Sequence, residues 1–130
     1  MARPAVAAAL LVVATAVAAR AAGVSVRKVE AIEGDRTVVK IHLSAPVPAP
    51  PRVHLYRKTT REPDRLAVDL PGVDIHGKPA RTATVGWGGI RRMRLGLPDP
   101  DTARVVLDLD APVGWDVATD ADVVSITLTP

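Results

Sequence analysis

Residues 101–113 read DTARVVLDLDAPV, and residues 35–47 read DRTVVKIHLSAPV. The two segments align without a gap, both end in Ala-Pro-Val, and their aliphatic residues recur at every second position. A period of two is typical of a strand that has one buried face and one solvent-facing face. The echo predicts an internal pseudo-repeat, with related sheets built from each half of the chain.

The same alternation continues outward from these two segments. Four more runs share it, at residues 24–29, 53–56, 66–70 and 124–128. Residues 90–95 break the rhythm once, and a β-bulge near Arg91 and Arg92 would restore the phase. No segment after Gly23 has a convincing helical period.

Turn-forming residues separate the predicted strands. They lie at residues 33–35, 46–51, 71–72 and 98–101 and are rich in Gly, Pro and Asp. Residues 74–89 are the least patterned stretch and are predicted to be a long connection that crosses between two sheets. Seven or eight short strands with frequent turns predict an all-β sandwich of two mainly antiparallel sheets.

The N-terminal segment is typical of a secretory signal peptide. Arg3 gives a short positive start, residues 5–19 are almost entirely Ala, Val and Leu, and small residues crowd the region before Val24. An uncleaved membrane anchor is the alternative, although the run is Ala-rich and short for a span. We expect cleavage near residue 22, so that residues 1–22 are the signal peptide and residues 23–130 form one domain without stable membrane insertion.

Charge and cysteine content limit the classes of partner. Removal of residues 1–22 takes away Arg3 and Arg20, so the 17 basic residues fall to 15 against 14 acidic ones. A net charge this small gives little support to nucleic-acid binding, and any electrostatic recognition must come from a local patch. The chain has no Cys, which excludes disulfides and a lipid-modified cysteine.

The residues that could carry catalysis are few and scattered. None of the serines after the signal segment lies in a Gly-x-Ser-x-Gly elbow, and the carboxylates fall in turns and at outward strand positions, with no sign of burial. His42, His54 and His76 lack metal-ligand spacing, although His42 and His54 could face outward near each other across a strand pair. We expect no enzyme activity, no metal and no cofactor.

An Arg-x-x-x-Asp pattern occurs twice, as Arg65 with Asp69 and as Arg104 with Asp108. Residues four apart on a strand share a face, so these side chains are predicted to point outward. They either form a flat polar surface that hydrogen-bonds a ligand's amides and carboxylates, or they pair across strands to keep the sheet soluble and in register. The two interpretations are compatible if only some of the arginines are paired.

Arg91, Arg92 and Arg94 form the most local positive cluster. They are either an anion clamp or the charges that protect an edge strand from pairing with another chain. Aromatic residues are scarce, which argues against a sugar-stacking groove. Trp115 is expected to plug the core or its rim, whereas Trp87, between glycines on a flexible connection, is the better candidate for ligand contact.

Taken in order, several segments resemble the AMIN domain family. They are the strand pair that ends in Ala-Pro-Val, PDRLAVDLPG at residues 63–72, IRRMRLG at residues 90–96 and ARVVLDL at residues 103–109. The resemblance covers about Val24 to Leu128.

The resemblance implies a β-sandwich of two related sheets, found attached to septal N-acetylmuramoyl-alanine amidases and type IV pilus secretins, that binds peptidoglycan in the periplasm. The ligand-binding candidates are then Arg65, Asp69, Arg91, Arg92, Arg94, Arg104, Asp108 and Trp87. The sequence stops at Pro130, so we expect no amidase or secretin domain after the last strand, and what is localised stays open. A periplasmic adaptor that pairs an exposed sheet edge with a secretin, amidase or division protein is the alternative.

Overall fold

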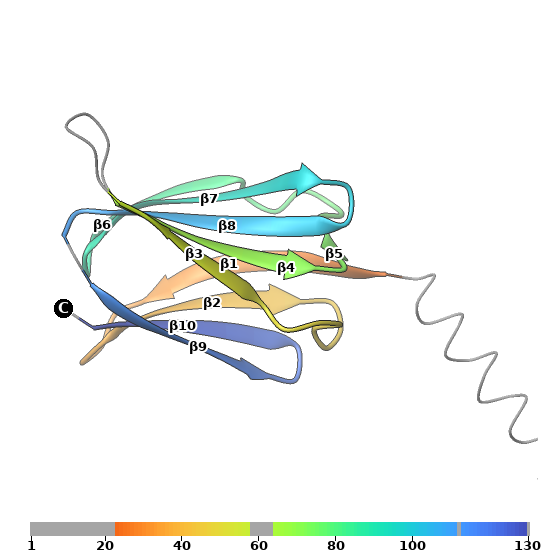
Figure 1. The fold of residues 1–130 in the computed structure, drawn as a ribbon, viewed down its shortest axis with the longest axis horizontal. Helices are drawn as coiled ribbons and strands as arrows, with labels where there is room; N and C mark the ends of the chain where they lie inside the picture. The colour runs from red at the N-terminus through yellow and green to blue at the C-terminus, as the bar shows by residue number, and fades with distance from the viewer. Residues whose placement is uncertain (1–22, 58–63, 112, 130) are drawn as a thin grey trace, which may run out of the picture.

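The computed structural model describes residues 23–57, 64–111 and 113–129, which form ten strands and no helix. The predicted signal peptide lies outside the described residues. The strands make two five-stranded sheets packed face to face (Figure 1). The all-β sandwich predicted from the alternation is therefore confirmed.

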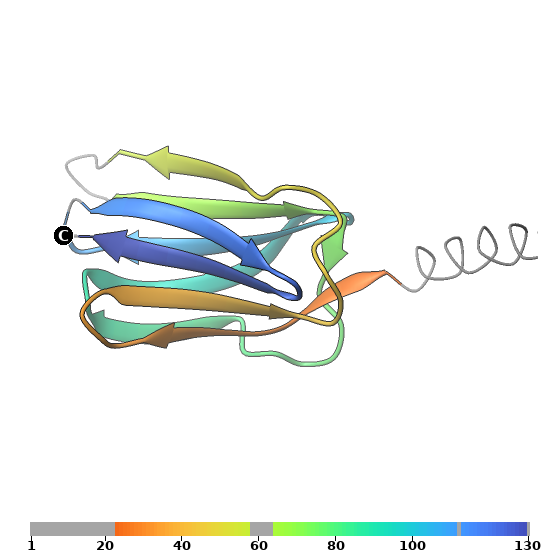
Figure 2. The same ribbon diagram turned by 90° about the horizontal axis from the view of Figure 1, so that it is seen from below.

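The first sheet has β5 and β9 at its edges. Its order is β5 (Val73–Asp74), β1 (Val24–Ile32), β2 (Thr37–Leu43), β10 (Val123–Thr129) and β9 (Gly114–Asp120). Every pairing in it is antiparallel except the two-residue contact between β1 and β5. Figure 2 views the molecule from the side of this sheet.

The second sheet has β3 and β6 at its edges and is antiparallel throughout. Its order is β3 (Arg52–Tyr56), β4 (Arg65–Pro71), β8 (Thr102–Leu109), β7 (Ile90–Asp99) and β6 (Thr82–Trp87). The connection predicted over residues 74–89 is wrong in its second half, because β6 pairs with β7 there.

The two echoed segments occupy equivalent places. Residues 35–47 contain β2 and residues 101–113 contain β8, and each is the central strand of its sheet. The halves of the chain do not each build a sheet, however, because β9 and β10 return to the first sheet. The repeat therefore relates the central strands, which must bury aliphatic side chains along their whole length.

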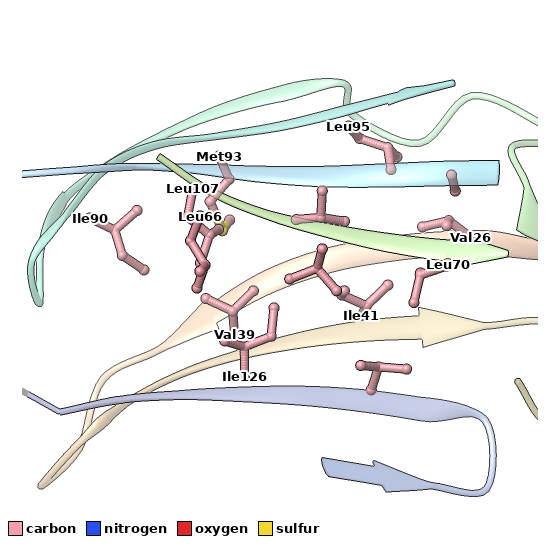
Figure 3. Close-up of a cluster of buried hydrophobic side chains, with 14 of the residues drawn as sticks. Val26, Val39, Ile41, Leu66, Leu70, Ile90, Met93, Leu95, Leu107 and Ile126 are labelled. Atoms are coloured by element: carbon pink, nitrogen blue, oxygen red, sulfur yellow. The ribbon is translucent and has the colours of Figure 1, made fainter. Parts of the chain in front are cut away.

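The core lies between the sheets (Figure 3). The alternating aliphatic residues of β2, β4, β8 and β10 point into it, and all are at most 2% exposed. The β-bulge predicted in β7 is confirmed, since its pairing with β8 shifts between Ile90 and Arg92. This extra residue lets Ile90, Met93 and Leu95 all face the core.

Candidate functional site

The outer face of the second sheet carries most of the predicted site residues. Because Cα partners stand opposite each other on neighbouring strands, its outward side chains form rows across the sheet. From β3 to β7, the three rows are Arg52–Asp69–Arg104–Gly96, His54–Ala67–Val106–Arg94 and Tyr56–Arg65–Asp108–Arg92. The two Arg-x-x-x-Asp patterns lie on adjacent antiparallel strands, so the arginine of each faces the aspartate of the other.

Arg104 and Asp69 form a two-pronged ion pair across β8 and β4. The Arg104 Nε and one terminal nitrogen donate to the two Asp69 oxygens at 2.6 and 3.0 Å. These hydrogen bonds hold the pKa of the Asp69 carboxyl below its ordinary value of 3.8, and partial burial opposes them only in part. The cross-strand pairing predicted from the sequence is therefore present at this position.

Asp108 is the centre of a larger cluster. Its side chain is 1% exposed, and it accepts hydrogen bonds from Arg92 Nε at 2.8 Å and from an Arg94 terminal nitrogen at 2.9 Å. Arg65 Nε lies 3.3 Å from one of its oxygens. The expectation that no carboxylate is buried is wrong here, because three guanidinium groups lie against this one and two of them, from Arg92 and Arg94, donate hydrogen bonds to it.

The cluster at residues 91–94 does not guard an edge, because β7 lies between β8 and β6. The bulge instead places Arg91 and Arg92 side by side on the exposed side of the strand. Arg92 turns toward Asp108, and Arg91 pairs with Asp110 at 3.1 Å.

Two hollows open between the arginine side chains. One, of about 430 Å³, is lined by Tyr56, Arg57, Arg65, Ala67, Arg94, Arg104 and Val106. The other, of about 410 Å³, shares Arg94, Arg104 and Val106 and continues over Gly96 and Leu97 toward Arg81. Each falls within the size range of small-ligand sites. We call them the Ala67 hollow and the Gly96 hollow.

The outer faces of the two sheets differ in charge. The three rows on the second sheet contain five arginines against two carboxylates, Asp69 and Asp108. On the first sheet, Lys28 and Lys40 are set against carboxylates of β1 and β9, and Lys28 pairs with Glu30 at 2.7 Å. We call the surface formed by these three rows the arginine face; its five arginines are Arg52, Arg65, Arg92, Arg94 and Arg104.

The structure separates the predicted site residues into groups. Arg65, Arg94 and Arg104 line a hollow, whereas Asp69 and Asp108 hold arginines in place. The remaining predicted residues, Arg91, Arg92 and Trp87, line neither hollow.

The two tryptophans lie at edges. Trp87 ends β6 and is half-buried in a paired strand, so its predicted place on a flexible connection is wrong. Trp115 is 42% exposed on edge strand β9, at the rim rather than in the core.

β3 contributes side chains to this face that the sequence did not predict as site residues. Arg52, His54 and Tyr56 alternate on its exposed side, and Tyr56 lines the Ala67 hollow. Their period of two was the available signal, but nothing in the sequence places β3 beside β4.

The described residues contain no metal centre and no membrane-spanning helix. Within residues 23–57, 64–111 and 113–129, no group of three or more His, Asp or Glu side chains could hold a metal ion, and no helix could cross a membrane. The predicted proximity of His42 and His54 is wrong, because β2 and β3 belong to different sheets. His42 instead lies 3.6 Å from Glu30.

Comparison with known proteins agrees with the resemblance seen in the sequence. The sequence model of the AMIN domain matches residues 28–128, nearly the whole chain. No curated protein matches the chain at a significant level. AMIN domains are non-catalytic modules that bind peptidoglycan and localise proteins, and they occur in periplasmic and envelope proteins. With two sandwiched sheets and a match over nearly its whole folded length, this chain belongs to the AMIN domain family.

Proposed function

We propose that this protein is exported to the periplasm and binds peptidoglycan through the arginine face, and that it thereby localises or anchors an envelope machine. The observation that carries this assignment is the excess of arginine on one of two otherwise similar sheets. Peptide stems of peptidoglycan carry free carboxylates, and guanidinium groups bind carboxylates with paired, directional hydrogen bonds. Family membership supports the same ligand class.

The paired carboxylates support a binding role as well as a structural one. Asp69 and Asp108 fix four of the five arginines at their Nε or terminal nitrogens. A guanidinium has five N–H donors, so each retains donors for a ligand. Because the side chains are already ordered, less conformational entropy is lost on binding.

Sedimentation with protein-free sacculi tests the proposal. We expect the purified protein to sediment with the wall, and the double variant Arg65→Gln, Arg104→Gln to lose at least about fivefold in affinity, because two charge-assisted contacts are removed. The matched control is Lys28→Gln, Lys40→Gln, which removes the same charge from the first sheet.

Thermal melts of both double variants establish that they are folded. Equal loss in the two variants would mean that net charge rather than the arginine face controls binding. Absence of sedimentation for the unaltered protein would contradict wall binding altogether.

One observation favours a second candidate, a protein–protein adaptor. Edge strand β9 is almost entirely exposed over seven residues and carries the half-exposed Trp115. An exposed edge can pair with a strand of a secretin, amidase or division protein. In the same assay an adaptor of this kind stays in solution with protein-free wall.

A further inference from the structure

The Ala67 hollow combines a small apolar floor with a cationic rim. Ala67 and Val106 are Cα partners on β4 and β8, and they line the floor at the middle of the sheet. The neighbouring rows carry long arginine side chains, so the two short residues leave a depression between them. Ala67 is only 1% exposed, so the accessible part of the floor is mainly the half-buried Val106. Such a small apolar floor fits a small aliphatic side chain better than a sugar ring, which usually stacks on an aromatic face.

The arginines of the rim have more N–H donors than the two aspartates can accept. The oxygens of Asp69 and Asp108 already accept from Arg104, Arg92 and Arg94. By contrast, the buried Arg94 Nε has no hydrogen-bond partner in the described part of the chain. A buried donor without an acceptor is costly. The Arg94 side chain as a whole is 35% exposed and lines the hollow, so its terminal N–H groups are within reach of an anionic acceptor there.

The size and chemistry of the hollow narrow the ligand class. A planar guanidinium matches the two oxygens of a carboxylate, and a residue such as alanine places a methyl group next to its own terminal carboxylate. A bare phosphate also pairs with arginine but has no apolar part to contact Ala67 and Val106. The combination of floor and rim therefore favours a C-terminal alanine over an inorganic anion.

We propose that the Ala67 hollow binds the terminal carboxylate of a peptide stem, with the alanine methyl group against Val106 and the carboxylate on Arg94 and its neighbours. This proposal rests on the proposed function, because peptidoglycan stems supply such ends. It assigns recognition to the peptide part of the wall rather than to the glycan.

Titration with N-acetyl-D-alanyl-D-alanine tests the assignment. The purified protein is followed by amide chemical shifts, with the C-terminal amide of the same dipeptide and inorganic phosphate at matched ionic strength as comparisons. We expect saturable shifts on β4, β7 and β8 with the free acid, at least tenfold weaker binding of the amide, and no saturation by phosphate. Equal binding of the acid and the amide, or saturation by phosphate at the same concentration, would overturn the proposal.

Variants separate the two hollows. Arg94→Gln removes the unpaired donor, while Arg92 and Arg65 still cover Asp108. We expect this variant to bind the dipeptide at least fivefold more weakly. Lys40→Gln on the first sheet is the control. Gly96→Val fills the neighbouring hollow, where no atom lies within 4 Å of an added Cβ, and it should leave binding unchanged. Weaker binding by Gly96→Val, or unchanged binding by Arg94→Gln, would contradict the placement of the ligand in the Ala67 hollow.

The outcome also separates this inference from the proposed function. A protein that sediments with sacculi but ignores the dipeptide binds the wall by another feature, and the inference is then wrong while the function stands. If the protein binds the dipeptide but not sacculi, the carboxylate site is supported and the proposed binding to the wall is wrong.

Discussion

At the scale of single residues, Asp69 links the stability of the sandwich to pH. Its pKa is held below its ordinary value of 3.8 by hydrogen bonds from Arg104. A carboxyl group whose pKa is lower in the folded state adds stability that is fully present above the unfolded pKa. This stability is lost as the pH falls through the folded pKa. Protonation of Asp69 should therefore reduce the stability of the fold only under acidic conditions.

We predict that Asp69→Asn lowers the free energy of unfolding by about 1–2 kcal/mol at neutral pH, because a mostly buried, two-pronged ion pair is lost. The difference from the unaltered protein should shrink as the pH falls below about 3.8, because the carboxyl of the unfolded chain then takes up a proton while the folded carboxyl, whose pKa is lower, is still ionised. Chemical denaturation over a pH series measures it. A difference that stays constant down to pH 2 would show that the ion pair does not cause the effect.

Asp108 shows why a residue-level site could be foreseen only in part. The Arg-x-x-x-Asp spacing placed both aspartates on an outward face, and the register confirms this. The burial of Asp108 depends on three arginines, two of which come from β7. The turn predicted at residues 98–101 joins β7 to β8, so this neighbour could be foreseen. The register that brings Arg92 and Arg94 to Asp108 also depends on a shift between Gly96 and Asp99, which the sequence did not predict.

At the scale of the strands, the β6–β7 hairpin is fixed by two glycines. Gly88 and Gly89 have φ angles of +66° and +85°, as a tight two-residue turn requires. The turn also packs against the start of β2, since a Cβ on Gly88 would overlap Thr37 Oγ1 and lie 3.1 Å from Thr37 Cβ. The hairpin thus touches the opposite sheet and helps to close that end of the sandwich.

We predict that Gly88→Ala lowers the free energy of unfolding by about 1–3 kcal/mol, because it combines an unfavourable φ with a clash against a short, β-branched side chain. The control is Gly96→Ala, where φ is ordinary and no atom lies within 4 Å. That variant should differ from the unaltered protein by less than about 0.5 kcal/mol. Similar melting temperatures for the two variants would contradict the contact between the turn and β2.

The strands that the sequence did not reveal share one property. β5, β6 and β9 are three of the four edge strands, and the central strands were all foreseen. An edge strand buries little, so its sequence is not forced to alternate: β9 reads GWDVATD and is exposed at six of its seven positions. Hydrophobic periodicity reports burial, and it therefore fades where burial ends.

At the scale of the whole molecule, charge is distributed unevenly although the total is small. The complete chain has a net charge of +3, and the N-terminal segment contributes two of its arginines. The excess on the second sheet is offset elsewhere, so the proposed binding to the wall would gain little from long-range attraction and would depend on short-range contacts at one face. Such contacts are screened by salt according to the number of charges that engage the ligand.

We predict that raising NaCl from about 0.05 to 0.5 M weakens binding of the unaltered protein to sacculi by roughly tenfold, because the Debye length falls well below the width of the arginine face. The Arg65→Gln, Arg104→Gln variant should show a shallower salt dependence, since fewer charges remain to be screened. The Lys28→Gln, Lys40→Gln variant should keep the steeper dependence of the unaltered protein. If all three proteins respond to salt alike, the second sheet does not bind the wall, and the edge strand β9 becomes the better candidate for the binding surface.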